Sequence, residues 1–247
     1  MTLPVHLVAA GALDAHTVGS LARLDGPEGR HAVVVRRTRV GERLVLADGA
    51  GRAVEGEVVH VERDLLDVRV DVVREDPEPS PRFVLVQALA KGDRDDQAVE
   101  AATECGVDEV VPWQAARSIV QWRGERGEKA RRKWDAVLVA ATKQSRRTRR
   151  PVLGPTSTTT DLVERARDAA LVLVLHEDAT EPLAAVALPE AGDVLVVVGP
   201  EGGIAPEEVA ALEAAGARTV RLGSTVLRAS SAGPAALAVL SAASRWR

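Results

Sequence analysis

Aromatic and sulfur-containing residues are scarce in this sequence. Its 247 residues include no Tyr, one Phe, four Trp, one Met and one Cys. A single cysteine excludes a disulfide framework and a cysteine-rich zinc site. So few aromatic rings argue against the RNA-binding modules that stack bases on rows of aromatic side chains.

Long apolar runs and a leader segment are also missing. No stretch approaches the roughly 18 consecutive apolar residues of a membrane-spanning helix. The N-terminal residues 1–6 carry no basic stretch followed by an apolar run, so we expect no signal peptide and a cytoplasmic location. The five histidines show no metal-ligand spacing, and we therefore expect no bound metal. A composition with 46% hydrophobic and 28% charged residues is typical of a globular protein.

The net charge of −4 is distributed unevenly along the chain. Residues 1–80 carry 10 Lys or Arg against 14 Asp or Glu, residues 81–155 carry 15 against 10, and residues 156–247 carry 7 against 12. Between Arg117 and Arg150, 12 basic residues accompany only three acidic ones. This local excess predicts a phosphate-binding surface, although 28 Arg against four Lys also indicates a general bias toward arginine.

The first part of the chain alternates apolar and polar residues. Residues 43–47, 52–62 and 65–73 are predicted to form half-buried antiparallel strands, and residues 28–37 a helix. This pattern is typical of a small β-barrel. Residues 76–81 contain three prolines, which extend neither a strand ladder nor a helix, so a linker is expected there.

After this linker, strands alternate with helices. The apolar runs at 171–175 and 194–198 show no alternation, which predicts a parallel sheet with both faces covered by helices. Further strands are expected at residues 83–88, 109–111 and 219–222, and helices at 95–105, 128–145, 207–215 and 234–245. We therefore predict an α/β chain with two domains, at residues 1–75 and 82–247.

Three loops that follow predicted strands carry the candidate binding residues. They comprise residues 175–178, 198–204 and 222–228, and in open α/β sheets ligands bind beyond the carboxyl ends of the strands. Glycines in these loops allow a ligand to approach the backbone closely. Glu201 lies between glycines, where its side chain is expected to face the crevice; the alternative is a simple tight turn. Neither the dinucleotide-binding nor the P-loop glycine pattern occurs.

Six motifs, taken together and in order, resemble the 16S ribosomal RNA (uracil-N3)-methyltransferase family of trefoil-knot (SPOUT) enzymes. They lie at residues 30–37 with 41 and 48–49, at 91–94, at 104–112, at 117–118 with 143–151, at 198–203 and at 222–228. The resemblance covers nearly the whole chain. Two departures stand out: Ala229, Ser230 and Ser231 replace the family's frequent Thr-Glu-Thr, and Arg146 replaces the glycine of its Q-S-G-R segment.

The resemblance implies a PUA-like RNA-binding β-barrel followed by an α/β trefoil-knot domain that binds S-adenosylmethionine and forms a homodimer. The implied substrate is 16S rRNA of the small ribosomal subunit, methylated at N3 of a uridine. The cofactor-binding residues would be Leu175, His176, Glu177, Val198, Gly199, Pro200, Glu201, Gly202, Gly203, Leu222, Gly223, Val226 and Leu227.

The resemblance also suggests roles for individual charged side chains. Arg228 is the candidate for stabilising negative charge on the uracil. Glu201 is the candidate base or cofactor-orienting carboxylate, and the alternative is that it only shapes its loop. The residues expected to meet RNA phosphates are Arg36, Lys91, Arg94, Arg117, Lys143, Arg146 and Arg147.

Two other functions fit the same residues. A related knotted scaffold could methylate a ribose 2′-hydroxyl, and the sequence does not exclude that chemistry. A non-catalytic RNA-binding or ribosome-assembly protein is the second alternative, although such a protein would not need the three strand-end loops.

Overall fold

The computed structural model describes residues 3–246, which form two compact units. The N-terminal unit extends to Glu78 and also includes Thr142–Arg150, whereas the C-terminal unit consists of Pro79–Ala141 and Pro151–Arg247. The chain passes from the first unit to the second within the proline-rich residues 76–81. The segment Thr142–Arg150, which lies inside the predicted domain 82–247, packs with the N-terminal unit instead.

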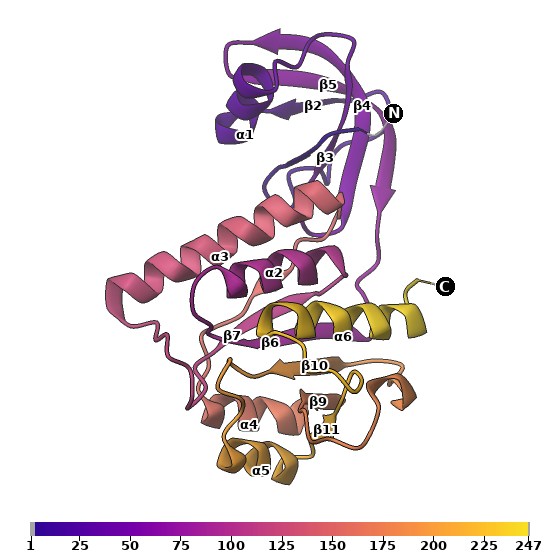
Figure 1. The fold of residues 1–247 in the computed structure, drawn as a ribbon. Helices are drawn as coiled ribbons and strands as arrows, with labels where there is room; N and C mark the ends of the chain where they lie inside the picture. The colour runs from indigo at the N-terminus through magenta and orange to yellow at the C-terminus, as the bar shows by residue number, and fades with distance from the viewer. Residues whose placement is uncertain (1–2, 247) are drawn as a thin grey trace. The chain divides into compact units, whose positions relative to one another are not determined.

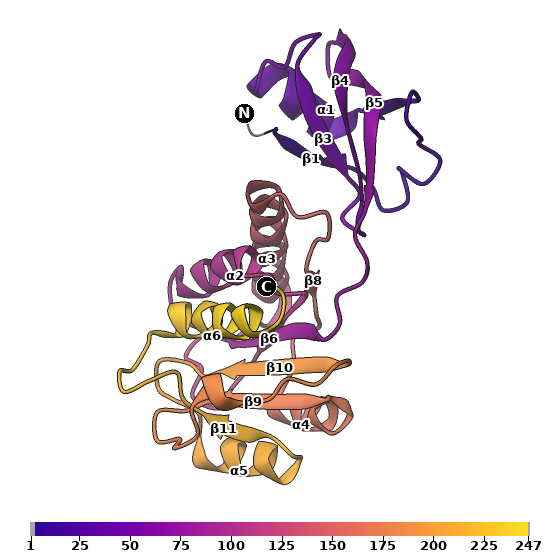
Figure 2. The same cartoon turned by 90° about the vertical axis from the view of Figure 1, so that its right-hand side faces the viewer.

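The N-terminal unit is built on a five-stranded sheet in the order β1-β3-β4-β5-β2 (Figures 1 and 2). Strand β1 runs parallel to β3, and the other neighbours are antiparallel. Alternate side chains such as Leu44, Val54 and Val68 form its core. The bounds are β1 (Val5–Leu7), β2 (Leu21–Leu24), β3 (Arg43–Ala47), β4 (Arg52–Glu62) and β5 (Leu65–Glu75).

The edges of this sheet and its helix complete the N-terminal unit. Among the described residues β1 and β2 do not pair with each other, so the hydrogen-bonded sheet is open where a barrel was predicted. Helix α1 (Gly26–Arg30) continues into a π-type turn, η1 (His31–Val35), within the predicted helix 28–37. Hydrogen bonds from the backbone of Ala50 and Arg52 to the Asp48 carboxylate, 2.7 and 3.0 Å long, shape the turn between β3 and β4.

The C-terminal unit contains a fully parallel six-stranded sheet in the order β11-β9-β10-β6-β7-β8. Val172, Leu173 and Val174 of β9 are almost completely buried, which confirms the prediction that this strand is covered on both faces. The strands are β6 (Arg82–Ala88), β7 (Glu109–Trp113), β8 (Val152–Leu153), β9 (Leu171–Leu175), β10 (Asp193–Val198) and β11 (Arg218–Val220).

Helices cover both faces of the parallel sheet (Figures 1 and 2). One face carries α2 (Arg94–Glu104), α3 (Gly124–Ser145) and α6 (Ala229–Ala243), with Trp134 and Leu237 in the core beneath them. The other face carries α4 (Thr159–Asp168) and α5 (Pro206–Ala214), with a separate core around Leu162 and Leu212. A short 3₁₀ turn, η2 (Leu183–Ala185), follows β9.

The chain returns from the edge of the sheet to its middle at the C-terminus. After the edge strand β11, the loop 221–228 leads to α6, which packs on the central strands β10 and β6. Helix α6 begins at Ala229 and not at the predicted residue 234, because the Arg228 carbonyl accepts hydrogen bonds from Ser231 and Ala232. Pro234 therefore lies inside the helix.

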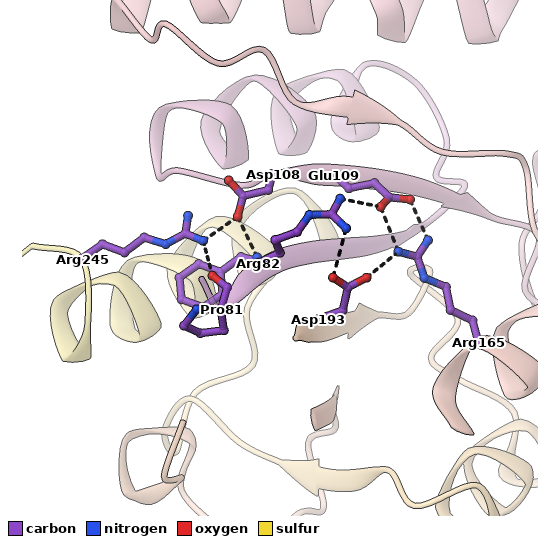
Figure 3. Close-up of polar contacts among 8 residues, drawn as sticks. Pro81, Arg82, Asp108, Glu109, Arg165, Asp193 and Arg245 are labelled. Carbon is purple, nitrogen blue, oxygen red and sulfur yellow. Dashed lines mark hydrogen bonds and ion pairs between the residues drawn. The ribbon is translucent and has the colours of Figure 1, made fainter. Parts of the chain in front are cut away.

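A network of four charged residues joins the amino ends of the central strands (Figure 3). Arg82, Glu109 and Asp193 are the first residues of β6, β7 and β10, and Arg165 comes from α4. Arg165 contacts Glu109 through two hydrogen bonds of 2.6 and 2.8 Å and Asp193 through one of 3.1 Å. Arg82 contacts Asp193 at 3.1 Å and Glu109 at 3.2 Å. Each arginine thus holds both carboxylates, which fixes the relative positions of three strands and one helix.

A second contact of the same kind attaches the C-terminal end of the described chain to this edge (Figure 3). The Arg245 guanidinium donates to the Pro81 carbonyl at 2.6 Å and to the Asp108 carboxylate at 2.5 Å. The same carboxylate oxygen accepts a 2.8 Å hydrogen bond from the Phe83 amide, and Arg245 lies 4.0 Å above the Phe83 ring. The amino edge of the sheet is therefore closed by paired charges.

Glu109 provides a test of this edge. Burial raises the pKa of Glu109, but hydrogen bonds and charge from Arg165 and Arg82 outweigh it and hold the pKa below its ordinary value of 4.5. Because the folded-state pKa is depressed, this group stabilises the fold above pH 4.5, and its contribution is lost as the pH falls through the folded pKa. Glu109→Gln should lower the free energy of unfolding by about 2 kcal/mol at pH 7 and flatten its dependence on acidic pH.

The measurement is urea unfolding followed by circular dichroism at several pH values. Glu164→Gln, an exposed position on the same helix as Arg165, is the matched control and should change stability by less than about 0.5 kcal/mol. Equal stability of the Glu109 and Glu164 variants would contradict a structural role for the network.

Candidate active site

One cavity of about 900 Å³ opens at the carboxyl edge of the parallel sheet, opposite the charged network. It is formed by the loops after β9 and β10 and by the loop 221–228 with the start of α6. Every predicted cofactor-binding residue lines it, namely Leu175, His176, Glu177, Val198, Gly199, Pro200, Glu201, Gly202, Gly203, Leu222, Gly223, Val226 and Leu227. Arg228 lines it as well. The fold thus brings together loops that lie up to about fifty residues apart.

The loop after β10 needs its glycines for space and for backbone conformation. A β-carbon on Gly199 would lie 2.6 Å from Cγ1 of Ile204, which is far inside van der Waals contact. Gly203 has a φ of +74°, a left-handed conformation that favours glycine, and its amide donates to the Pro200 carbonyl at 2.9 Å. These constraints fold residues 199–203 into a tight turn, and this turn forms part of the cavity wall.

Glu201 projects from this turn toward the loop that follows β6. Its Oε1 accepts hydrogen bonds from Nη1 of Arg94 at 3.0 Å and from the Lys91 amide at 3.3 Å. Partial burial raises the pKa of Glu201, but hydrogen bonds from its own amide, the Lys91 amide and Arg94 lower it by more, so the pKa lies below its ordinary value. The group therefore stays ionised and is a weak base. Arg94, predicted to meet RNA phosphate, is engaged with Glu201 in this structure.

Glu208, a buried carboxylate that belongs to none of the sequence motifs, joins segments next to the cavity wall. Glu208 of α5 is 5% exposed. Its two oxygens accept hydrogen bonds from the Ala116 amide at 2.9 Å, from the Thr159 hydroxyl at 2.6 Å and from the Ala205 amide at 3.2 Å. Three separate segments thus converge on one side chain. The acidic residues in the first turn of α5 were visible in the sequence, but the distant partners were not.

The loop that joins Ala116 to the wall also supplies an arginine to the cavity. Arg117 lines the cavity, and its Nη1 donates to the Gly202 carbonyl at 3.1 Å. A β-carbon on Gly202 would lie 3.5 Å from Cβ of Arg117, an ordinary van der Waals distance, so the two residues are neighbours. Glu208 holds the backbone at Ala116, the residue that precedes Arg117.

The third loop presents backbone donors without internal acceptors. Among the described residues, none of the amides of residues 222–227 donates a hydrogen bond within the chain. Val226 is 76% exposed and Leu227 39% exposed, so this loop is bound loosely to the rest of the unit. The Arg228 guanidinium likewise contacts no partner within the described part of the chain. These donors are available to a ligand.

The loop after β9 fixes the ring of its histidine. The His176 amide donates to the Val220 carbonyl at 3.0 Å, and Nδ1 of the ring accepts a 3.2 Å hydrogen bond from the Asp178 amide. Because an amide can only donate, a neutral His176 carries its proton on Nε2. The cavity thus combines apolar side chains, such as Leu175, Val198 and Leu222, with unsatisfied backbone donors. This combination fits a ligand that has an aromatic ring and several polar groups.

The residues predicted to bind RNA are divided between the two units. Lys91, Arg94 and Arg117 belong to the C-terminal unit, and Arg94 and Arg117 line the cavity. The other four, Arg36, Lys143, Arg146 and Arg147, belong to the N-terminal unit.

Lys143 has an internal partner in the N-terminal unit. Its Nζ lies 2.7 Å from Oε1 of Glu28, and Nδ1 of the buried His6 lies 3.3 Å from the other carboxylate oxygen. The hydrogen bond from His6 is the largest cause, and together with Lys143 it outweighs burial and lowers the pKa of Glu28 to about 2. The charge of Lys143 is thus largely matched within the protein. Arg36 and Arg146, by contrast, are exposed.

Residues 3–246 contain neither a metal-ligand cluster nor a membrane-spanning helix. No cluster of three or more His, Cys, Asp or Glu side chains in this range could hold a metal ion. No helix within the same range is long and apolar enough to cross a membrane.

Family models match both parts of the chain. A model described as an RNA methyltransferase domain matches residues 77–241, and one described as an RNA methyltransferase PUA domain matches residues 24–71. These matches confirm the predicted fold class, an N-terminal PUA-like domain followed by a C-terminal α/β methyltransferase domain of the SPOUT type.

Individual relatives agree with the family models. The "Ribosomal RNA small subunit methyltransferase E" of Mycobacterium bovis is 48% identical over 92% of this chain and 89% of its own length. The protein of the same name from Bacillus subtilis is 28% identical over 88% of each chain. A putative methyltransferase from Legionella pneumophila, solved in complex with bound cofactor SAM, superposes with a TM-score of 0.85 at 28% identity and covers 98% of both chains. The chain therefore belongs to the ribosomal RNA small subunit methyltransferase E family.

Proposed function

We propose that this protein transfers a methyl group from S-adenosylmethionine to N3 of a uridine in 16S rRNA of the small ribosomal subunit. The observation that carries this proposal is the cavity at the carboxyl edge of the sheet. It unites three strand-end loops, two of which contain glycine, with backbone donors that have no acceptor within the described residues and with the Arg228 guanidinium. Membership of the family and its small-subunit rRNA relatives supports the same substrate class.

The residues of the cavity suit S-adenosylmethionine, which when bound supplies an electrophilic methyl group. The apolar side chains of Leu175, Val198 and Leu222 would hold the adenine ring. The amides of residues 222–227 would satisfy the polar groups of the cofactor, and the tight turn at residues 199–203 would form the wall beside it. These groups would bind the cofactor within the cavity that Arg228 also lines.

The uracil requires a positive partner. Its N3–H is weakly acidic, and N3 is a poor nucleophile until that proton has passed to solvent water. Negative charge then develops on O2 and O4, and a guanidinium that has no internal partner can stabilise it at little cost of reorganisation. We assign this role to Arg228, which lies at the start of α6 on the cavity wall.

Glu201 is assigned a positioning role. Of the functions considered for it, proton abstraction is disfavoured because its pKa lies below the ordinary value and its Oε1 is already engaged by Arg94 and the Lys91 amide. The carboxylate connects the loop after β10 with the loop after β6. It thereby shapes the cofactor side of the cavity.

The RNA would be held by basic residues of both units, namely Arg36, Lys91, Arg94, Arg117, Lys143, Arg146 and Arg147, and the target base would have to be unpaired or flipped out. We also propose that the protein acts as a homodimer in the cytoplasm, where its rRNA substrate is found. Ile119 and Val226 of the C-terminal unit are apolar side chains exposed at 78% and 76%, and a second copy could cover either of them.

The decisive experiment measures methyl transfer from labelled S-adenosylmethionine to small subunits that lack the modification, followed by nucleoside analysis. We expect 3-methyluridine at a single nucleotide. A 2′-O-methylated nucleoside would show that the reaction is ribose methylation instead. No incorporation, together with no thermal shift on addition of saturating cofactor, would favour a non-catalytic RNA-binding protein.

The role of Arg228 is tested by its replacement. Arg228→Ala should reduce kcat by about 100-fold, because one preorganised donor to a developing oxyanion is lost, and should leave the Kd of the cofactor within about threefold. Arg228→Lys, which keeps the charge but not the planar fork, should lose less. Kinetics at saturating RNA and calorimetric titration of the cofactor provide the measurements. An unchanged kcat would remove Arg228 from the mechanism.

Glu201 is tested by its pH profile. Glu201→Gln keeps the shape of the side chain and weakens its contacts with Arg94 and Lys91, so we expect a rise in the KM of the cofactor and a fall in kcat of about tenfold or less. The pH dependence of kcat should keep its shape. A loss of 1,000-fold or more with disappearance of one ionisation would identify Glu201 as the base.

Glu208 is expected to affect the cofactor site from a distance. Glu208→Gln replaces one acceptor oxygen with an amide that cannot accept from Ala205 or Ala116. We expect the Kd of the cofactor to rise by about tenfold, and thermal stability to fall. Glu207→Gln is the matched control, since Glu207 is the exposed neighbouring acid in the same helical turn. Equal cofactor affinities of the two variants would contradict the positioning role of Glu208.

A further inference from the structure

Two arginines of the N-terminal unit have a left-handed backbone. Arg37 and Arg146 both have a φ of +58°, and among residues 3–246 they are the only non-glycine residues with a positive φ. This conformation brings Cβ close to the following carbonyl, so a residue other than glycine adopts it at a cost in stability. Twelve glycines adopt positive φ elsewhere in the chain. The two arginines therefore need an explanation that glycines do not.

The local reason for the conformation is the same at both positions. Each arginine directly follows the last turn of a helical segment, where the chain reverses in a Schellman-type ending. After Arg37, the Thr38 amide donates back to the Ala32 carbonyl at 3.0 Å. After Arg146, the Arg147 amide donates back to the Thr142 carbonyl at 3.1 Å. Glycine is the usual residue in the left-handed position of such an ending, so both sites would be satisfied by a smaller residue.

Neither arginine makes an internal contact that would offset the cost of its left-handed backbone. Both are exposed, and within the described part of the chain neither guanidinium has a hydrogen bond or an ion pair. Arg149 shows the contrast: its guanidinium donates to the Asp76 carbonyl at 2.7 Å and to the Pro77 carbonyl at 3.0 Å. Arg149 has a structural role in the unit, whereas Arg37 and Arg146 have none that the structure shows.

The surroundings of both arginines are basic. Arg30, Arg36 and Arg39 lie close to Arg37 in the chain, and Arg147, Arg149 and Arg150 follow Arg146. The carboxylate between the two helical segments, Glu28, is already occupied by His6 and Lys143. Glu28 is therefore already neutralised, and no carboxylate among the described residues forms an ion pair with Arg37 or Arg146.

We propose that Arg37 and Arg146 are phosphate-binding residues of the N-terminal unit, kept in a strained conformation because they contact the RNA backbone. Strain that no internal contact offsets points to a function outside the folded chain. Arg37 is thereby added to the residues expected to contact RNA. Phosphate binding also explains why arginine stands at position 146, where the family's segment has glycine. The inference rests on the proposed function, since RNA is the ligand in both.

The alternative explanation is the arginine-rich composition, which would place arginine at these positions without any use. The two explanations differ in their prediction for glycine. If the arginines bind phosphate, glycine at these positions should stabilise the protein and weaken RNA binding at the same time. If composition alone placed them, glycine should stabilise the protein and leave RNA binding unchanged.

The experiment compares Arg37→Gly, Arg146→Gly and the double variant with the unaltered protein. RNA affinity is measured by filter binding of small subunits lacking the modification over a range of salt concentrations, and stability by the midpoint of urea unfolding. We expect each single variant to unfold at higher urea and to bind RNA about threefold to tenfold more weakly. The slope of log affinity against log salt should decrease by about one for each arginine removed.

Two controls separate the effect from a general loss of charge. Arg63→Gly removes an exposed arginine with an ordinary backbone from the hairpin between β4 and β5, and it should lower stability with little change in RNA affinity. Arg146→Lys keeps both the charge and the strain, so it should retain most of the affinity with unchanged stability. Unaltered RNA binding of both glycine variants, or an equal loss in Arg63→Gly, would overturn the proposal. Failure of the proposed function would instead be seen as absent methyl transfer by the unaltered protein at saturating RNA.

Discussion

The two edges of the parallel sheet in the C-terminal unit differ: ion pairs fix the amino edge, whereas loops with few internal contacts form the carboxyl edge. At the amino edge, Arg165 and Arg82 each bind both Glu109 and Asp193, so that the first residues of three strands are fixed in register. At the carboxyl edge the loops are held by few contacts, and the amides of residues 222–227 have no internal acceptor among the described residues. Rigidity at the amino edge prepares the carboxyl edge for ligand binding. The loops can present their backbone donors to a ligand in a fixed geometry only if the strands that carry them do not move.

Three carboxylates illustrate how burial and partners separate structural from functional roles. Glu109 is paired with two arginines far from the cavity, and Glu208 is buried behind the cavity wall with only neutral donors around it. Glu201 lies at the cavity itself, and its partners depress its pKa. The depressed pKa matters for mechanism, since removal of the N3 proton from uracil needs a basic group. A carboxylate that stays ionised because cations and amides surround it is suited to holding two loops together.

Much of the fold could be predicted from the sequence where burial alone dictates the residue pattern. Strand β9 was predicted with its observed bounds. Because both of its faces are buried, every side chain along it is apolar, and this uninterrupted run is visible in the sequence. Helix α4 was missed because it buries only Leu162 and Ala166, although the reciprocal cap between Thr158 and Asp161 was readable. Strand β11 ends at Val220, which leaves Leu222 in the loop that lines the cavity and not in a strand.

The residues of the candidate site divide in the same way. Those in the loops that follow apolar strands were found from the sequence, and the structure gathers them into one cavity. Glu208 was missed, because its partners Ala116 and Thr159 lie 92 and 49 residues away and no local pattern records such contacts. Arg37 was missed for a different reason: only the backbone conformation distinguishes it from the other arginines of an arginine-rich chain.

The scarcity of aromatic residues constrains how RNA can be recognised. Of the four tryptophans, Trp113 and Trp134 are buried, and Trp122 packs edge-on against Trp134 with ring centroids 4.9 Å apart. These three rings therefore belong to the core and offer no platform for stacking bases. Contacts with RNA are expected mainly from lysine and arginine side chains, which bind phosphates, from guanidinium planes that can stack on bases, and from backbone donors at the cavity, while Trp246, 57% exposed, offers a single ring. Such binding is electrostatic and local, which is consistent with a chain whose net charge is negative but whose basic residues are concentrated between Arg117 and Arg150.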